Sequence, residues 1–200
     1  MQQKVVARRW VAFGLLHPMI PAAVQHANLL RRIRWWTACF ILGLVLSGAT
    51  ALPLETELGW LARLFGVATA SVAVGDTSLP GWIHRVWTGV RETNQHYPFM
   101  AYGTDWLAFA HFVIAIAFIG AWRDPVRNRW LFDFGLIACA LVIPFALIAG
   151  SARGIPFNWR LIDCSFGLGG ALPLWYCRKL ALQAEQLVAQ GSRLPPISVP

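Results

Sequence analysis

The sequence predicts an all-α integral membrane protein with four transmembrane helices, N-in/C-in topology, and a cap of helix and loop on the outer side. The 200-residue chain is 57% hydrophobic and only 13% charged, whereas soluble domains carry about 25% charged residues. Its uncharged stretches approach the 20 or so residues that cross a hydrocarbon core of roughly 30 Å as a helix. Basic residues gather in alternate connections, as the positive-inside rule requires.

Four apolar segments are the predicted spans, and the rest of the chain divides around them. The spans cover residues 35–54, 106–122, 130–150 and 161–177. A basic amphipathic cytoplasmic segment (1–34) precedes them, a long outer loop (55–104) follows the first, and a cytoplasmic tail (181–200) ends the chain. The fourth span has the weakest signal because three glycines and Pro173 interrupt it.

The distribution of charge sets the predicted orientation. Basic residues flank the inner ends of the spans: Lys4, Arg8, Arg9, Arg31, Arg32, Arg34, Arg123, Arg127, Arg129, Arg178, Lys179 and Arg193. The other two connections carry five arginines against six acids. Both termini of this multi-pass protein are therefore expected in the cytoplasm, as an even number of spans requires. The net charge of +8 does not predict a nucleic-acid partner, because the basic residues stand beside spans.

The long outer loop contains its own structural signals. Residues 82–92 carry Trp82, Val86 and Val90 at helical spacing, which predicts a helix lying on the outer interface. Residues 64–75 are uncharged but too short to span, so they are expected to form a re-entrant or surface segment. Residues 94–98 are predicted to form a turn.

Ionisable residues at the outer ends of the spans form the candidate site, because such groups are costly within a membrane and often functional. The set comprises Asp105, His111, Arg153, Arg160 and Asp163. One interpretation is a network of ion pairs that clamps the helix ends. The other is a polar pocket for a lipid head group, a phosphate or a quinone ring, since arginine suits planar anions.

His111 has a further interpretation as an axial ligand of haem or of a chlorophyll-type pigment. A bis-histidine haem needs a second intramembrane histidine, which the sequence lacks, so a hydrogen bond to Asp105 or to a backbone carbonyl is favoured. No other metal site is expected, because the four cysteines fall in apolar spans without CxxC spacing. Asp133 is expected to form an ion pair at the inner end with Arg127 or Arg129 or to bond Asn128.

Small and aromatic residues predict contacts with other subunits. Trp82, Trp87 and Trp159 are expected on the outer surface, where they would grip a partner or the headgroup region. Gly167 and Gly169 form small pairs with Ala171 and Ser165 at i, i+4, which favours close helix packing.

Three segments of the second half carry a resemblance: YPFMAYGTDWLAFAHF (97–112), RDPVRN (123–128) and RGIPFNWRLIDCSFG (153–167). Together they resemble a group of small bacterial polytopic inner-membrane proteins of unassigned function. The resemblance implies a bacterial membrane protein and carries no activity with it.

Three functions are hypotheses at this point. The first is a non-catalytic accessory or assembly subunit of a larger respiratory or photosynthetic membrane complex, because no catalytic motif is present. The second is a membrane enzyme or carrier for a lipid-linked or isoprenoid substrate held by the outer Asp/His/Arg set. The third is a pigment- or haem-binding protein that acts through His111. Membrane lipids are expected partners, and a bound lipid is the expected ligand.

Overall fold

The computed structural model describes residues 22–69 and 76–191, which are helical and contain no strand. The helices are α2 (Ala22–Ala51), α3 (Leu54–Leu64), α4 (Leu79–His96), the 3-10 helix η1 (Pro98–Ala101), α5 (Tyr102–Arg123), α6 (Trp130–Ala152) and α7 (Phe157–Gly191). The predicted segment 1–34 is covered only from residue 22 onward, and the end of the tail lies outside the described residues.

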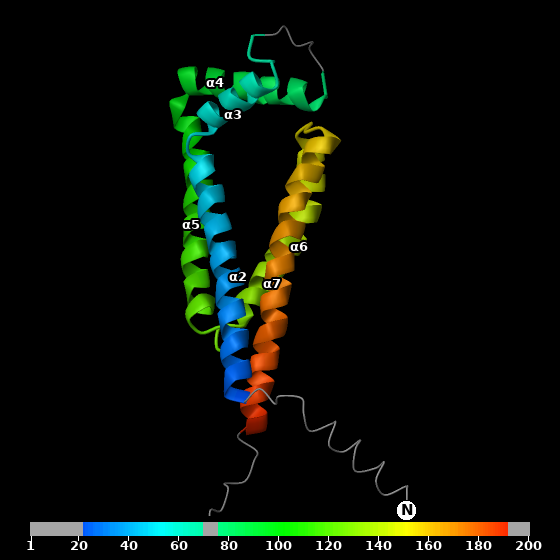
Figure 1. Ribbon diagram of the computed structural model, residues 1–200. Helices are drawn as coiled ribbons and strands as arrows, with labels where there is room; N and C mark the ends of the chain where they lie inside the picture. The colour runs from blue at the N-terminus through cyan, green and yellow to red at the C-terminus, as the bar shows by residue number, and fades with distance from the viewer. Residues whose placement is uncertain (1–21, 70–75, 192–200) are drawn as a thin grey trace, which may run out of the picture.

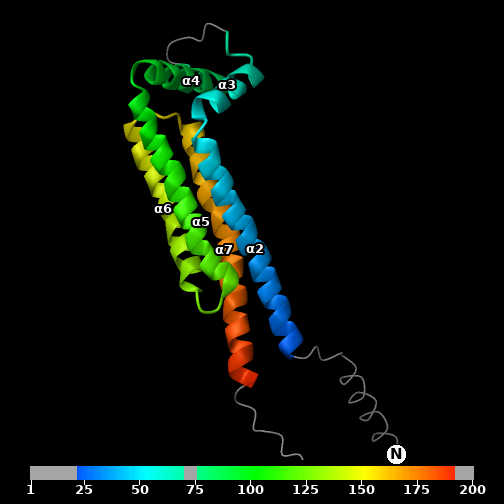
Figure 2. The ribbon, with the colours of Figure 1, turned by 90° about the vertical axis from the view of Figure 1, so that its left-hand side faces the viewer.

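The four long helices form two antiparallel pairs, α2 with α5 and α6 with α7 (Figure 1). The pairs converge at one end, where α2 packs against α7, and splay apart at the other. Helices α3 and α4 lie across the splayed end, as both views show (Figures 1 and 2). We call this the cap end, and the opposite end, where residues 124–129 join α5 to α6, the loop end.

Most of the buried core lies toward the loop end, where α2 and α7 meet. Ile33, Phe118, Phe132, Leu174 and Cys177 are almost fully buried there. The Cys177 thiol contacts the Ile33 carbonyl oxygen at 3.7 Å, and the buried hydroxyl of Thr37 contacts the same sulfur at 3.7 Å. This core joins the two helix pairs at one end only, because close packing of α2 on α7 stops where the helices splay.

Three helical segments are long and apolar enough to cross a membrane: Ala22–Ala51, Pro98–Arg123 and Trp130–Ala152. They fit a membrane protein and include most of each of the first three predicted spans. α7 is not among these three. It packs along α6 and α2 and extends to residue 191, well beyond the predicted fourth span.

The helix bounds refine the sequence-based expectations. α2 (Ala22–Ala51) runs without a break into the first apolar segment, in agreement with the helical character of residues 22–34. α3 was not predicted, because Pro53, Glu55 and Glu57 indicate only the exit from a span. The predicted turn at 94–98 is wrong for residues 94–96, since α4 continues to His96 before η1 begins.

The cap is an amphipathic helix pair tied together by side chains. The predicted helix over residues 82–92 is confirmed and is longer than expected, as α4, whose first turn is capped by the Ser78 side chain accepting from the Gly81 N–H at 3.2 Å. The Asn94 amide donates to the Glu55 carboxylate at 2.8 Å, which holds α4 against α3.

Candidate functional site

A cleft of about 580 Å³ separates the two helix pairs. Its walls come from all four long helices: Trp36, Cys39, Phe40, Gly43, Leu44 and Ser47 of α2, His111 of α5, Val142 of α6, and Asp163, Ser165, Phe166, Gly169, Gly170 and Pro173 of α7. The cleft exists because α2 and α7 diverge between the loop-end core and the cap end. Two of the five predicted site residues, His111 and Asp163, line it.

The lining changes character along its length. The polar lining residues lie in the turns of the cleft nearest the cap end: Ser47, His111, Asp163 and Ser165. Toward the loop end the lining is mostly apolar. From Trp36 to Ser47 the cleft follows about 16 Å of helix at about 1.5 Å per residue. That length is about half the roughly 30 Å thickness of a hydrocarbon core. The cleft is therefore polar at one end and apolar along most of its length.

His111 is held in one orientation by its own helix. Its Nδ1 lies 2.8 Å from the carbonyl oxygen of Leu107, one turn earlier in α5. A carbonyl accepts only, so in the neutral ring Nδ1 carries the proton and Nε2 is left as an acceptor. This backbone bond is one of the two partners that the sequence predicted, and Asp105 is not the partner.

Asp163 and the serines complete the polar end. The Ser165 hydroxyl donates to the Ile162 carbonyl at 2.6 Å, so its own proton is already used. The Asp163 carboxyl has no ion pair among residues 22–69 and 76–191. No lysine or arginine belongs to the lining. The polar end thus offers mainly hydrogen-bond acceptors.

Arg160 serves the α6–α7 turn and not the cleft. Its guanidinium donates to the Leu147 carbonyl at 3.2 Å and lies over the Phe157 ring at 5.3 Å. Its side chain also covers Gly150, where a Cβ would come within 2.7 Å of the arginine Cδ. The residue therefore fastens the end of α6 to the start of α7.

Arg153 and Asp105 also stand apart from the cleft. Arg153 is exposed at the C-terminal cap of α6, and Asp105 is exposed in the first turn of α5. Among the described residues, neither forms an ion pair with the other predicted site residues. The structure consequently brings together one part of the predicted set and leaves its arginines outside.

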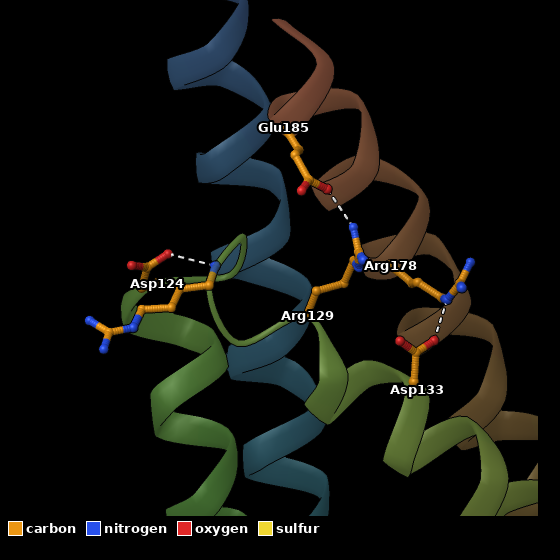
Figure 3. Close-up of polar contacts among 6 residues, drawn as sticks. Asp124, Arg129, Asp133, Arg178 and Glu185 are labelled. Carbon is orange, nitrogen blue, oxygen red and sulfur yellow. Dashed lines mark hydrogen bonds and ion pairs between the residues drawn. The ribbon is translucent and has the colours of Figure 1, made fainter. Parts of the chain in front are cut away.

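Ion pairs form instead at the loop end (Figure 3). Asp133 of α6 pairs with Arg178 of α7, and Arg129 pairs with Glu185. The expected partners of Asp133 were nearby residues in the α5–α6 connection, so this expectation is corrected to a partner 45 residues away. Both pairs fasten α7 to the start of α6.

The residues expected to contact other subunits have varied surroundings. Trp87 packs its indole nitrogen against Gly59 and so joins α4 to α3. Trp82 lies beneath Arg85, with its ring centroid 5.8 Å from the guanidinium carbon, and Trp159 is half-buried. Gly167 is buried against α6, whereas Gly169 faces the cleft with open space around it.

A metal site is not formed by any group of three or more His, Cys, Asp or Glu side chains in the described part of the chain. His111 remains the one cleft residue with a ring nitrogen that suits an axial ligand. Comparison of the chain with protein-family models, curated proteins and solved structures found no match.

Proposed function

We propose that this protein binds a neutral amphiphile in the cleft between its helix pairs. The polar head of the ligand lies beside His111 and Asp163, and its apolar tail extends along Phe40 and Leu44 toward the loop end. The observation that carries the proposal is the graded lining: titratable and hydroxyl side chains gather at one end of a cleft that is otherwise apolar. Ligand sites typically combine such apolar walls with a few placed polar groups.

The polar end favours a ligand head that donates hydrogen bonds. The Nε2 atom of His111 and the carboxylate of Asp163 are half-buried acceptors, and a donor on the ligand would replace the water that they lose when it binds. A hydroxyl head supplies this donor without a charge. A phosphate head is disfavoured, because Arg153 and Arg160 lie outside the cleft. An isoprenoid alcohol or a glycerolipid hydroxyl is therefore the ligand class that fits.

The proposal includes a topology with four spans in a bacterial inner membrane and both termini in the cytoplasm. Its support is the charge at the two ends of the described bundle. The loop end carries eight basic residues against three acids: Arg31, Arg32, Arg34, Arg123, Arg127, Arg129, Arg178 and Lys179 against Asp124, Asp133 and Glu185. The cap end carries five against six. The positive-inside rule then places the cap outside, with α7 as the fourth span and the polar end of the cleft in the outer leaflet.

A second candidate is an accessory subunit of a larger membrane complex. The observation that favours it is an exposed aromatic row on α5, in which Tyr102, Trp106 and Phe109 stack edge to face with centroids 5.9 and 5.5 Å apart. Aromatic side chains of this kind anchor protein interfaces. In this role the amphiphile in the cleft would be a structural lipid.

Lipid retention tests the binding function and separates it from the second candidate. The protein is purified from native membranes in mild detergent, and bound molecules and proteins are identified by mass spectrometry. We expect about one hydroxyl-headed amphiphile per chain, lost in Asp163→Ala and kept in Asp105→Ala. The control removes an exposed carboxyl group at the same end of the bundle. Equal retention in both variants overturns the proposed head site, and a stoichiometric protein partner establishes the accessory subunit.

A further inference from the structure

A second pocket, of about 560 Å³, lies at the loop end and is separate from the cleft. Its walls come from α2, from the α5–α6 connection and from the last turns of α7, and they include His26, Leu30, Arg34, Arg123, Val126 and Val188. Cationic and aliphatic side chains therefore line the same pocket. The pocket shares no lining residue with the amphiphile cleft, so a ligand at the loop end is independent of the proposed function.

The acids of this pocket are already engaged. One carboxylate oxygen of Asp124 accepts the Arg127 backbone N–H at 3.1 Å, and Glu185 forms the ion pair with Arg129 (Figure 3). Among the described residues, neither carboxylate forms an ion pair with Arg34 or Arg123.

The arginines keep donors for an incoming anion. Arg34 uses one nitrogen, Nη2, to donate to the Arg123 carbonyl oxygen at 3.2 Å, which fixes the end of α5 beside α2. A guanidinium has five N–H donors, so most of those of Arg34 remain. The Arg123 side chain makes no ion pair with any described residue. Two guanidinium groups on neighbouring helices can thus face one anion.

We propose that this pocket binds the phosphodiester headgroup of an anionic phospholipid. Arginine recognises phosphate oxygens with two parallel N–H donors, and Arg34 with Arg123 supplies that chemistry. Leu30, Val126 and Val188 supply the apolar contact that a lipid's glycerol and upper acyl chains require and a free phosphate ion does not. The net positive charge of the loop end draws anionic lipid toward it.

The test measures lipid binding by the full chain in mild detergent, using native mass spectrometry with phosphatidylglycerol and phosphatidylcholine as probes. We expect wild type to prefer phosphatidylglycerol and Arg123→Gln to weaken its binding by roughly five- to tenfold. The matched control is Arg153→Gln, which removes an exposed arginine at the end of α6 and should change binding by less than twofold. Arg34→Lys, which keeps the charge but loses the planar fork, should weaken binding less than Arg34→Gln.

Three results overturn the inference. Equal weakening by Arg123→Gln and Arg153→Gln indicates general charge attraction without a site. Equal binding of the two lipids by wild type removes the anion requirement. Displacement of phosphatidylglycerol by millimolar inorganic phosphate assigns the pocket to a free anion instead of a lipid.

Discussion

The Cys139 carbonyl oxygen lies 2.6 Å from the point that a Cβ atom on Gly167 would occupy. Helices α6 and α7 therefore touch backbone to backbone at this residue, as small residues permit within membranes. We predict that Gly167→Ala lowers the free energy of unfolding by about 1–3 kcal/mol, because the backbone cannot move aside without separating the helices. Thermal unfolding in detergent measures the loss.

Gly169, two residues later on α7, provides the matched control. A Cβ there would meet nothing within 4 Å, so Gly169→Ala is expected to leave stability unchanged or to raise it by up to about 1 kcal/mol through helix propensity. Equal destabilisation by the two variants would show that the α6–α7 contact does not depend on Gly167.

The ion pair between Asp133 and Arg178 is expected to contribute modestly to stability. Both side chains are 40% exposed, so solvent screens the pair and its contribution should be about 0.5–1 kcal/mol. A double-mutant cycle with Asp133→Asn and Arg178→Gln measures this coupling. The expected value falls in 0.5 M salt, and a coupling that is absent at low salt would contradict the contact.

Asp76 should make the first turn of α4 sensitive to acid. The Ser78 backbone N–H donates to the Asp76 carboxylate at 2.8 Å, and this bond, with help from the Ser78 side chain, lowers the Asp76 pKa from its ordinary value of 3.8. A carboxyl group with a lowered pKa stabilises the fold above its unfolded pKa and loses that effect as pH falls through its folded value. The protection factors of the residue 78–82 amides, which compare the observed exchange rate with the intrinsic rate at the same pH, should therefore fall below about pH 4, and Asp76→Asn should abolish this fall. A wild-type protection factor that does not change with pH would refute the role.

Cysteine labelling tests the four-span topology. In a background with the native cysteines replaced by alanine, Thr77→Cys in the cap should react with a membrane-impermeant maleimide in intact cells. Gln186→Cys near the end of α7 should react only after lysis, because an even number of spans puts that end in the cytoplasm. Labelling of both sites from the same side would show that α7 does not cross.

Much of the bundle was predictable because its signals are local. Residues 106–122 and 130–150 are apolar runs that only His111 and Asp133 interrupt, and α5 and α6 follow them closely. The last turns of α7 were missed because residues 181–191 are no longer continuously apolar. Glu185 holds this part of α7 by its ion pair with Arg129, at the start of α6. That contact depends on folding, not on the composition of the tail.

The candidate site was predictable only in part for a related reason. Sequence places His111 and Asp163 near the same end of the bundle, and the structure brings both to one cleft. The sequence does not show how each helix is rotated about its own axis. Arg160 lies three residues before Asp163, nearly one helical turn, yet its side chain turns toward the Leu147 carbonyl of α6. The cleft itself arises from the splay of α2 and α7, which no local pattern encodes.

The most direct measurement is amphiphile retention by a variant that fills the cleft. Gly169 lines the cleft with open space above it, so Gly169→Leu should occupy the binding volume without disturbing the fold. Gly103→Leu, on α5 outside the cleft and also unobstructed, is the matched control. We predict that solvent extracts of Gly103→Leu contain the same amphiphile as wild type, at about one per chain, and that extracts of folded Gly169→Leu lack it. Full retention by Gly169→Leu would contradict amphiphile binding in the cleft.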